Sequence, residues 1–134
     1  MSPQPITAAN RERLGKLRDL LLEQHKLLLD RERAAYEKIH QPISGPGALL
    51  NLVIGDPHFK WLKQISTLVV EIDEALSRRG KATEQTADLL IAQARELMKP
   101  RAEGSDFQAR YYDALQESPD IVILQCRIEQ LLRT

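Results

Sequence analysis

The sequence predicts an all-α protein, folded as one up-down-up-down four-helix bundle whose fourth helix is kinked at Pro119. Apolar residues recur at three- and four-residue steps along most of the chain, the spacing that gives a helix one buried face. Phe, Trp and Tyr make up only 4% of the 134 residues, which disfavours a β-sandwich. The connections after the second and third helices are short, so we expect antiparallel neighbours. This length fits a single domain, residues 1–134, with a sizeable core.

The first helix is expected from Ala8 to His40, after a loose leader at residues 1–6 that holds two prolines. Thr7 is a suitable N-cap for this helix. Two Leu triplets, 20–22 and 27–29, make the helix apolar around much of its circumference. Such a helix is either central in its own bundle or covered by another subunit. We therefore expect a homodimer formed through this helix.

The segment 41–55 is predicted to be a structured loop between the first and second helices. Pro42, Gly45, Pro46 and Gly47 interrupt regular helix, and the apolar run ALLNLVI follows at 48–54. A flexible linker would not carry so many aliphatic residues. The functional alternative for this loop is a ligand lid or a segment that docks a partner.

The second helix, from Gly55 to Gly80, is expected to be the centre of the bundle. Asp56 is a good N-cap and Pro57 suits the first helical position. Arg78 and Arg79 favour the last turn, and Gly80 can end the helix. The apolar stripe consists of Trp61, Leu62, Ile65, Leu68, Val69, Ile72 and Leu76.

The third and fourth helices are marked by their caps. Thr83 is expected to begin a helix that runs to about Lys99. Ser105 followed by Gln108 is a capping box for the fourth helix. Pro119 removes one backbone hydrogen bond, so we expect a kink there, or a restart capped by the preceding serine.

The net charge and the hydropathy of the chain limit the kinds of partner that we expect. Nineteen basic and nineteen acidic residues cancel, and without a basic excess we expect no nucleic-acid partner. No apolar run reaches the roughly 18 residues of a membrane span, and the N-terminus does not resemble a signal peptide. Cys126, the single cysteine, is expected to be a small core residue in a reducing compartment. These features predict a cytoplasmic protein with no membrane partner.

Four polar residues on apolar helix faces form the candidate ligand-binding site: His25, Glu32, Tyr36 and Asp73. His25 and Glu32 lie two turns apart on one face, with Tyr36 nearby. If the first two helices pair with Ile39 opposite His58, Asp73 faces Gln24 or His25. The simpler interpretation is a buried polar pair that fixes register, with Glu32 meeting an arginine. The alternative is a ligand or metal site in the bundle core.

Specific catalytic or metal motifs are not evident in the sequence. No Glu-x-x-His pair of the di-iron type is present, and the three histidines are too far apart to converge. We therefore predict no metal, no cofactor and no catalytic residue. Arg33 and His40 match the loose Arg-to-His spacing of HEPN-type ribonucleases, although Ala34 departs from the family pattern. Ribonuclease activity is thus a further alternative.

Three stretches, LLDRERAAYEKIH, ALLNLVIGDPHFKWLKQISTLVVEIDEAL and YYDALQESPDIVILQCRIEQLL, resemble a group of uncharacterised bacterial helical proteins. The resemblance implies a bacterial cytosolic protein and transfers no functional residue. Our leading interpretation is a non-enzymatic interaction or regulatory bundle that self-associates and has a possible protein partner. The alternatives are a ligand- or metal-binding bundle and the ribonuclease.

Overall fold

The computed structural model describes residues 3–77 and 82–133, and most of these residues are helical, as the sequence predicts. Apart from an isolated bridge between Pro5 and Thr83, they contain no β structure. The helices of the described residues are α1 (Ala8–Ile39), α2 (Pro46–Gly55), α3 (Pro57–Lys60), α4 (Lys63–Leu76), α5 (Glu84–Leu97), α6 (Asp106–Glu117) and α7 (Pro119–Leu132).

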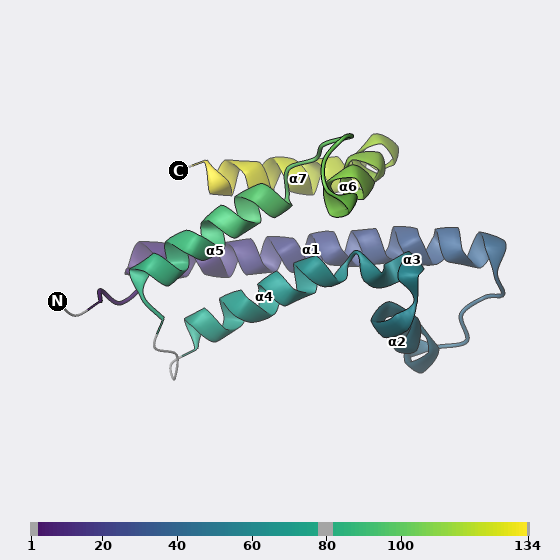
Figure 1. Ribbon diagram of the computed structural model, residues 1–134, viewed down its shortest axis with the longest axis horizontal. Helices are drawn as coiled ribbons and strands as arrows, with labels where there is room; N and C mark the ends of the chain where they lie inside the picture. Colours follow the sequence, from purple (N-terminus) through teal and green to yellow (C-terminus); the bar gives the residue numbers. More distant parts are fainter. Residues whose placement is uncertain (1–2, 78–81, 134) are drawn as a thin grey trace.

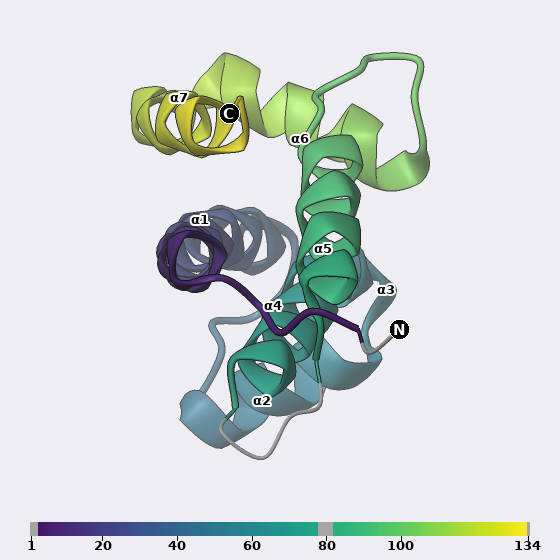
Figure 2. The same cartoon turned by 90° about the vertical axis from the view of Figure 1, so that its left-hand side faces the viewer.

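The longest helix, α1, lies at the centre of the molecule, in place of the second helix that the sequence predicts there. In the end-on view it is flanked by α4 on one side and α7 on the other, with α5 closing the third side (Figure 2). Leu14, Leu17, Leu21 and Leu28 of α1 are completely buried. Most of the apolar surface of α1 is therefore covered within the chain itself, which is the first of the two alternatives that the Leu triplets left open, although Leu22 is 49% exposed. The predicted dimer through α1 is not shown.

The long helices α1, α4, α5 and α7 alternate in direction along the view of Figure 1. A four-helix bundle with a kinked fourth helix is nevertheless not confirmed, because the predicted fourth helix is two helices. Ser118 ends α6, and its hydroxyl caps α7 by accepting from the backbone N–H of Ile121 at 3.4 Å. Pro119 stands at the first position of α7, where its missing N–H costs nothing. The axis of α6 therefore crosses that of α7 (Figure 1).

The predicted second helix is also divided, at Trp61 and Leu62. The backbone N–H of Leu62 donates to Phe59 at 3.1 Å, a three-residue spacing that tightens the chain between α3 and α4. On a straight helix Phe59 and Trp61 would point about 200° apart. The tight turn allows both rings to be buried. Helix α4 ends at Leu76, while Arg78, Arg79 and Gly80 of the predicted last turn lie outside the described residues.

Local capping predictions are confirmed. The side chains of Thr7, Asp56, Thr83 and Ser105 each accept a backbone N–H at the start of a helix. The caps of α5 and α6 are complete capping boxes. The capping residues therefore set where these helices begin. The apolar periodicity did not predict correctly where the second and fourth predicted helices are divided.

Two other expectations differ from the structure. In the predicted loose leader, Ile6 is buried, and the carbonyl of Gln4 accepts from the N–H of Glu84 at 2.8 Å, so this segment is tied to the start of α5. Cys126 is exposed rather than in the core. It lies two residues from both Leu124 and Ile128, which places it about 200° around α7 from the buried face.

Helix α2 stands away from the rest of the molecule (Figure 1). It occupies most of the predicted structured loop at 41–55, packs chiefly against α3, and contains no buried residue. Gly45 precedes it with φ +153°, a conformation that favours glycine. We call α2, Pro46–Gly55, the apolar arm. None of the helices in the described residues is long and apolar enough to cross a bilayer.

Candidate functional site

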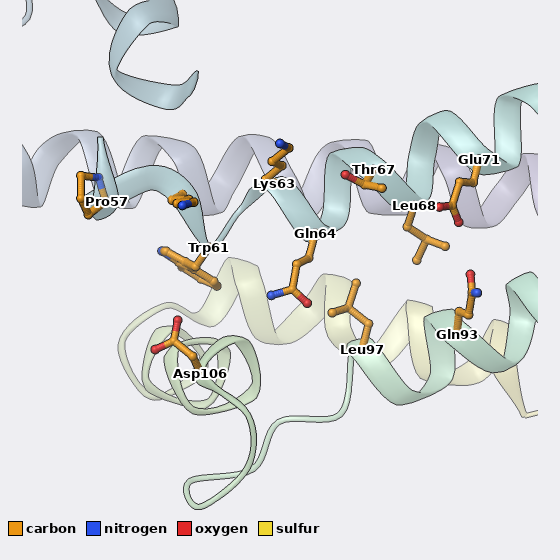
Figure 3. A pocket seen from close by; sticks show the side chains of 11 residues that line it. Pro57, Trp61, Lys63, Gln64, Thr67, Leu68, Glu71, Gln93, Leu97 and Asp106 are labelled. Atoms are coloured by element: carbon orange, nitrogen blue, oxygen red, sulfur yellow. The ribbon is translucent and has the colours of Figure 1, made fainter. Parts of the chain in front are cut away.

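An open groove of about 640 Å³ lies between α4 and α5, a size typical of small-molecule sites. Trp61 and Asp106, the first residue of α6, form one end of it (Figure 3). Its apolar floor is formed by Leu68 and Leu97. The other lining residues are Pro57, Lys60, Lys63, Gln64, Thr67, Glu71 and Gln93. None of the four residues predicted as a ligand site lines this groove.

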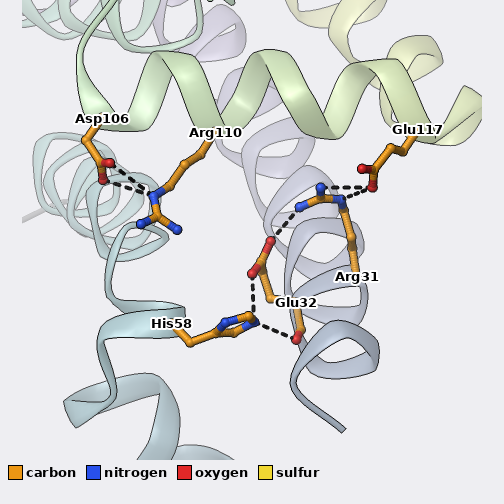
Figure 4. Close-up of polar contacts among 6 residues, drawn as sticks. All are labelled: Arg31, Glu32, His58, Asp106, Arg110 and Glu117. Carbon is orange, nitrogen blue, oxygen red and sulfur yellow. Dashed lines mark hydrogen bonds and ion pairs between the residues drawn. The ribbon is translucent and has the colours of Figure 1, made fainter. Parts of the chain in front are cut away.

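Glu32 occupies a buried polar cluster at the junction of α1, α3 and α6 (Figure 4). One carboxylate oxygen pairs with Arg31 at 2.5 Å, and the other accepts from Nε2 of His58 at 2.9 Å. The Arg31 guanidinium also reaches Glu117 of α6 at 2.9 Å. The expectation that Glu32 meets an arginine is confirmed. A buried carboxylate needs such partners, because taking it from water unpaired is costly.

His58 is held in one tautomer by Glu32. Its Nε2 lies 2.9 Å from the Glu32 carboxylate and 3.0 Å from the Glu32 backbone carbonyl. Both partners are acceptors, so Nε2 carries a proton and donates to them. The backbone N–H of His58 meanwhile donates to Asp56 at 2.8 Å. These bonds fix α3 against α1.

Tyr36 lies beside this cluster. Its ring stacks on His40 with centroids 4.3 Å apart and meets the edge of His58 at 5.7 Å. Tyr36 and Glu32 are therefore brought together around His58, a residue that the sequence analysis did not include in the site. The feature of the sequence that could have pointed to His58 is its position directly after Asp56 and Pro57, at the start of a helix.

His25 and Asp73 are not brought together. The carboxylate of Asp73 pairs with Arg18 at 3.1 Å, about two helical turns along α1 from His25. His25 is partly buried elsewhere on α1, and burial lowers the pKa of its imidazole. Among the described residues, no three His, Cys, Asp or Glu side chains are placed to hold a metal ion. The metal alternative therefore finds no site in His25, Glu32 and Asp73.

The residues of the ribonuclease alternative have local partners. Arg33 pairs with Glu37 at 3.3 Å, and His40 stacks on Tyr36. Ribonuclease activity stays an untested prediction.

A buried network of amide and hydroxyl groups was not predicted from the sequence. Gln24 donates to the Tyr111 hydroxyl at 2.7 Å and to the carbonyl of Ile121 at 2.9 Å. Tyr111 in turn donates to Gln125, whose amide donates to the carbonyl of Met98 at 2.9 Å. The network thus joins α1, α6, α7 and the end of α5. The missed signal was a glutamine at core spacing within the apolar stripes of α1 and α7.

Neither a family model, nor a curated protein, nor a solved structure matches this chain.

Replacing Tyr111 by Phe is expected to lower the free energy of unfolding by roughly 1–3 kcal/mol. Burial raises the pKa of the Tyr111 hydroxyl, so this group stays protonated and donates to Gln125. Without it, the buried Gln125 oxygen loses its donor. Urea denaturation measures the change. Tyr112→Phe is the matched control, because Tyr112 is 37% exposed. Equal stability of the two variants would show that the network contributes nothing.

Replacing His25 by Gln is expected to flatten the dependence of stability on acid. Burial lowers the pKa of His25 below its ordinary value of 6.5, so the unfolded chain binds a proton more readily than the folded one. Stability of the wild type should thus fall as the pH drops below about 6.5. Urea titrations at pH 7.5 and pH 5 should show a smaller fall for the variant. An identical fall would mean that other groups account for it.

Proposed function

We propose that this chain is a non-enzymatic interaction module that self-associates through the apolar arm, α2. The observation that carries the proposal is the exposure of that arm. Leu50 is 58% exposed and Ile54 is 70% exposed, on a helix with no buried residue. Burying one such side chain stabilises a protein by roughly 1.5–3 kcal/mol of free energy, and the exposed arm does not gain this stabilisation within a single chain.

A second copy of the chain is the occupant that fits the arm. A two-fold interface places a surface against itself, so a charge close to the two-fold axis faces its own like charge. From Gln41 to Gly55 the chain contains no Asp, Glu, Lys or Arg, and such a segment meets no repulsion in that arrangement. An interfacial membrane helix would instead carry Lys or Arg on its polar face. Packing of arm against arm is thus the arrangement that this composition favours.

The arm replaces α1 as the proposed dimer surface. The inner face of α1 is occupied by α4, α5 and α7 of the same chain, and among its large apolar side chains Leu22 is the one exposed outside the final turn, at 49%. We place the module in the cytosol, where a reducing environment keeps the exposed Cys126 thiol free.

Light scattering coupled to gel filtration tests the proposal. The wild type is expected to elute with twice the monomer mass at high micromolar concentration. Replacing Leu50 and Ile54 together by Asp should give a monomer with an unchanged circular dichroism spectrum, because both side chains are exposed. The charges would oppose one another across the two-fold axis.

Leu22→Asp is the matched control. It adds the same charge to an exposed leucine on α1 and should leave the dimer intact. A wild type that stays monomeric at high concentration would refute self-association. A dimer that survives the double Asp change but dissociates with Leu22→Asp would return the interface to α1.

A further inference from the structure

The apolar stripe of α1 continues beyond the helices that cover it. Leu28 is completely buried, and Ala35 and Ile39 lie within about 20° of the same line along the helix. Ala35 is nevertheless only partly buried, and Ile39 is 79% exposed. Arg33 and Glu37 pair with each other at 3.3 Å, about 140–180° around the helix from this line. The last two turns of α1 therefore present an apolar face that the described residues leave uncovered.

The apolar arm of the same chain does not cover this face. The arm stands at the same end of the molecule, but it packs chiefly against α3 (Figure 1). The Glu37 carboxylate accepts from the backbone N–H of Ile43 at 2.9 Å, and this bond leads the chain away from α1 on the Glu37 side. Ile39 lies about 160° around the helix from that side. A cover for Ala35 and Ile39 would therefore come from another molecule.

The apolar arm offers more apolar surface than contact with one other arm would bury. Its large aliphatic side chains extend over about 200° of the helix and are all at least partly exposed: Leu49, Leu50, Leu52, Val53 and Ile54. A helix of 10 residues is about 15 Å long and about 10 Å wide, so one of its faces measures roughly 150 Å². A stable interface buries about 800 Å² on each partner. A stable dimer therefore needs surface beyond the contact of arm with arm.

We propose that each apolar arm also packs on the uncovered end of α1 of the second copy, so that Ala35 and Ile39 belong to the dimer interface. This inference rests on the self-association proposed above and adds a second contact to it. The arms meet at the two-fold axis, and each arm continues onto the partner's α1. The arm contains no charged side chain, so it brings no unpaired charge onto the apolar face of α1.

Sedimentation equilibrium measures the dissociation constant of the dimer. Replacing Ile39 by Asp should raise this constant about tenfold or more, because each copy loses the burial of one large apolar side chain. The circular dichroism spectrum should stay unchanged, since Ile39 is exposed. Leu89→Asp is the matched control, because Leu89 is 57% exposed on α5, and it should leave the constant unchanged. An unaltered constant for Ile39→Asp would overturn this inference and leave the dimer of arms standing, whereas a monomeric wild type would refute both.

Cross-linking between copies locates the contact. Cys126 is the single cysteine, so a chain with Cys126→Ser and one new cysteine contains one thiol, and any link joins two copies. One chain carries Ile39→Cys, the other carries Leu50→Cys and a mass tag, and a short bis-maleimide is added to the mixture. We expect a product that joins a tagged chain to an untagged one, and little of it when Leu89→Cys replaces Ile39→Cys. Equal yields from the two mixtures, or a product limited to paired Leu50→Cys chains, would contradict the contact with α1.

Discussion

The structure depends on covering one helix that is much longer than its neighbours. The 32 residues of α1 extend about 48 Å, whereas α4, α5 and α7, with 14 residues each, extend about 21 Å. Covering α1 therefore takes further elements, and α3 and α6 join it beyond the reach of the longer partners. No residue of α1 after Glu32 is buried, and Ile39 is 79% exposed. The apolar arm is the next helix in the chain after this uncovered end, from which residues 40–45 separate it.

The Glu32 carboxylate positions the segments that form the apolar arm and one end of the groove between α4 and α5. Its bond to His58 holds α3 on α1, and α3 is followed by Trp61 of the groove and preceded by the apolar arm. The same carboxylate binds Arg31, which continues to Glu117 on α6 (Figure 4). A group predicted as a possible ligand contact thus has a positioning role. Its burial is stable because each oxygen has a cationic or N–H partner.

Features set by neighbouring residues were predictable, whereas those set by distant contacts were not. Caps such as Thr7 and Thr83 follow from local hydrogen bonding, and the inward stripe of α4 follows from helical periodicity. The predicted register of α1 against α4 differs from the structure by about two helical turns. The reason is that the chain between these helices forms two helices of its own, α2 and α3. His58 consequently meets Glu32, and Asp73 meets Arg18 instead of His25. The groove needs the α4–α5 placement, which no local pattern encodes.

Hydrogen exchange along α1 tests the central claim most directly, since a helix that packs against most of the other helices can exchange its amides only when the whole fold opens. The amides between Leu17 and Leu28 should exchange more slowly than those of α4, α5 or α7, with an opening free energy equal to that of global unfolding. Faster exchange in this segment of α1 than in α4 and α7 would show that α1 is not the central element of the fold.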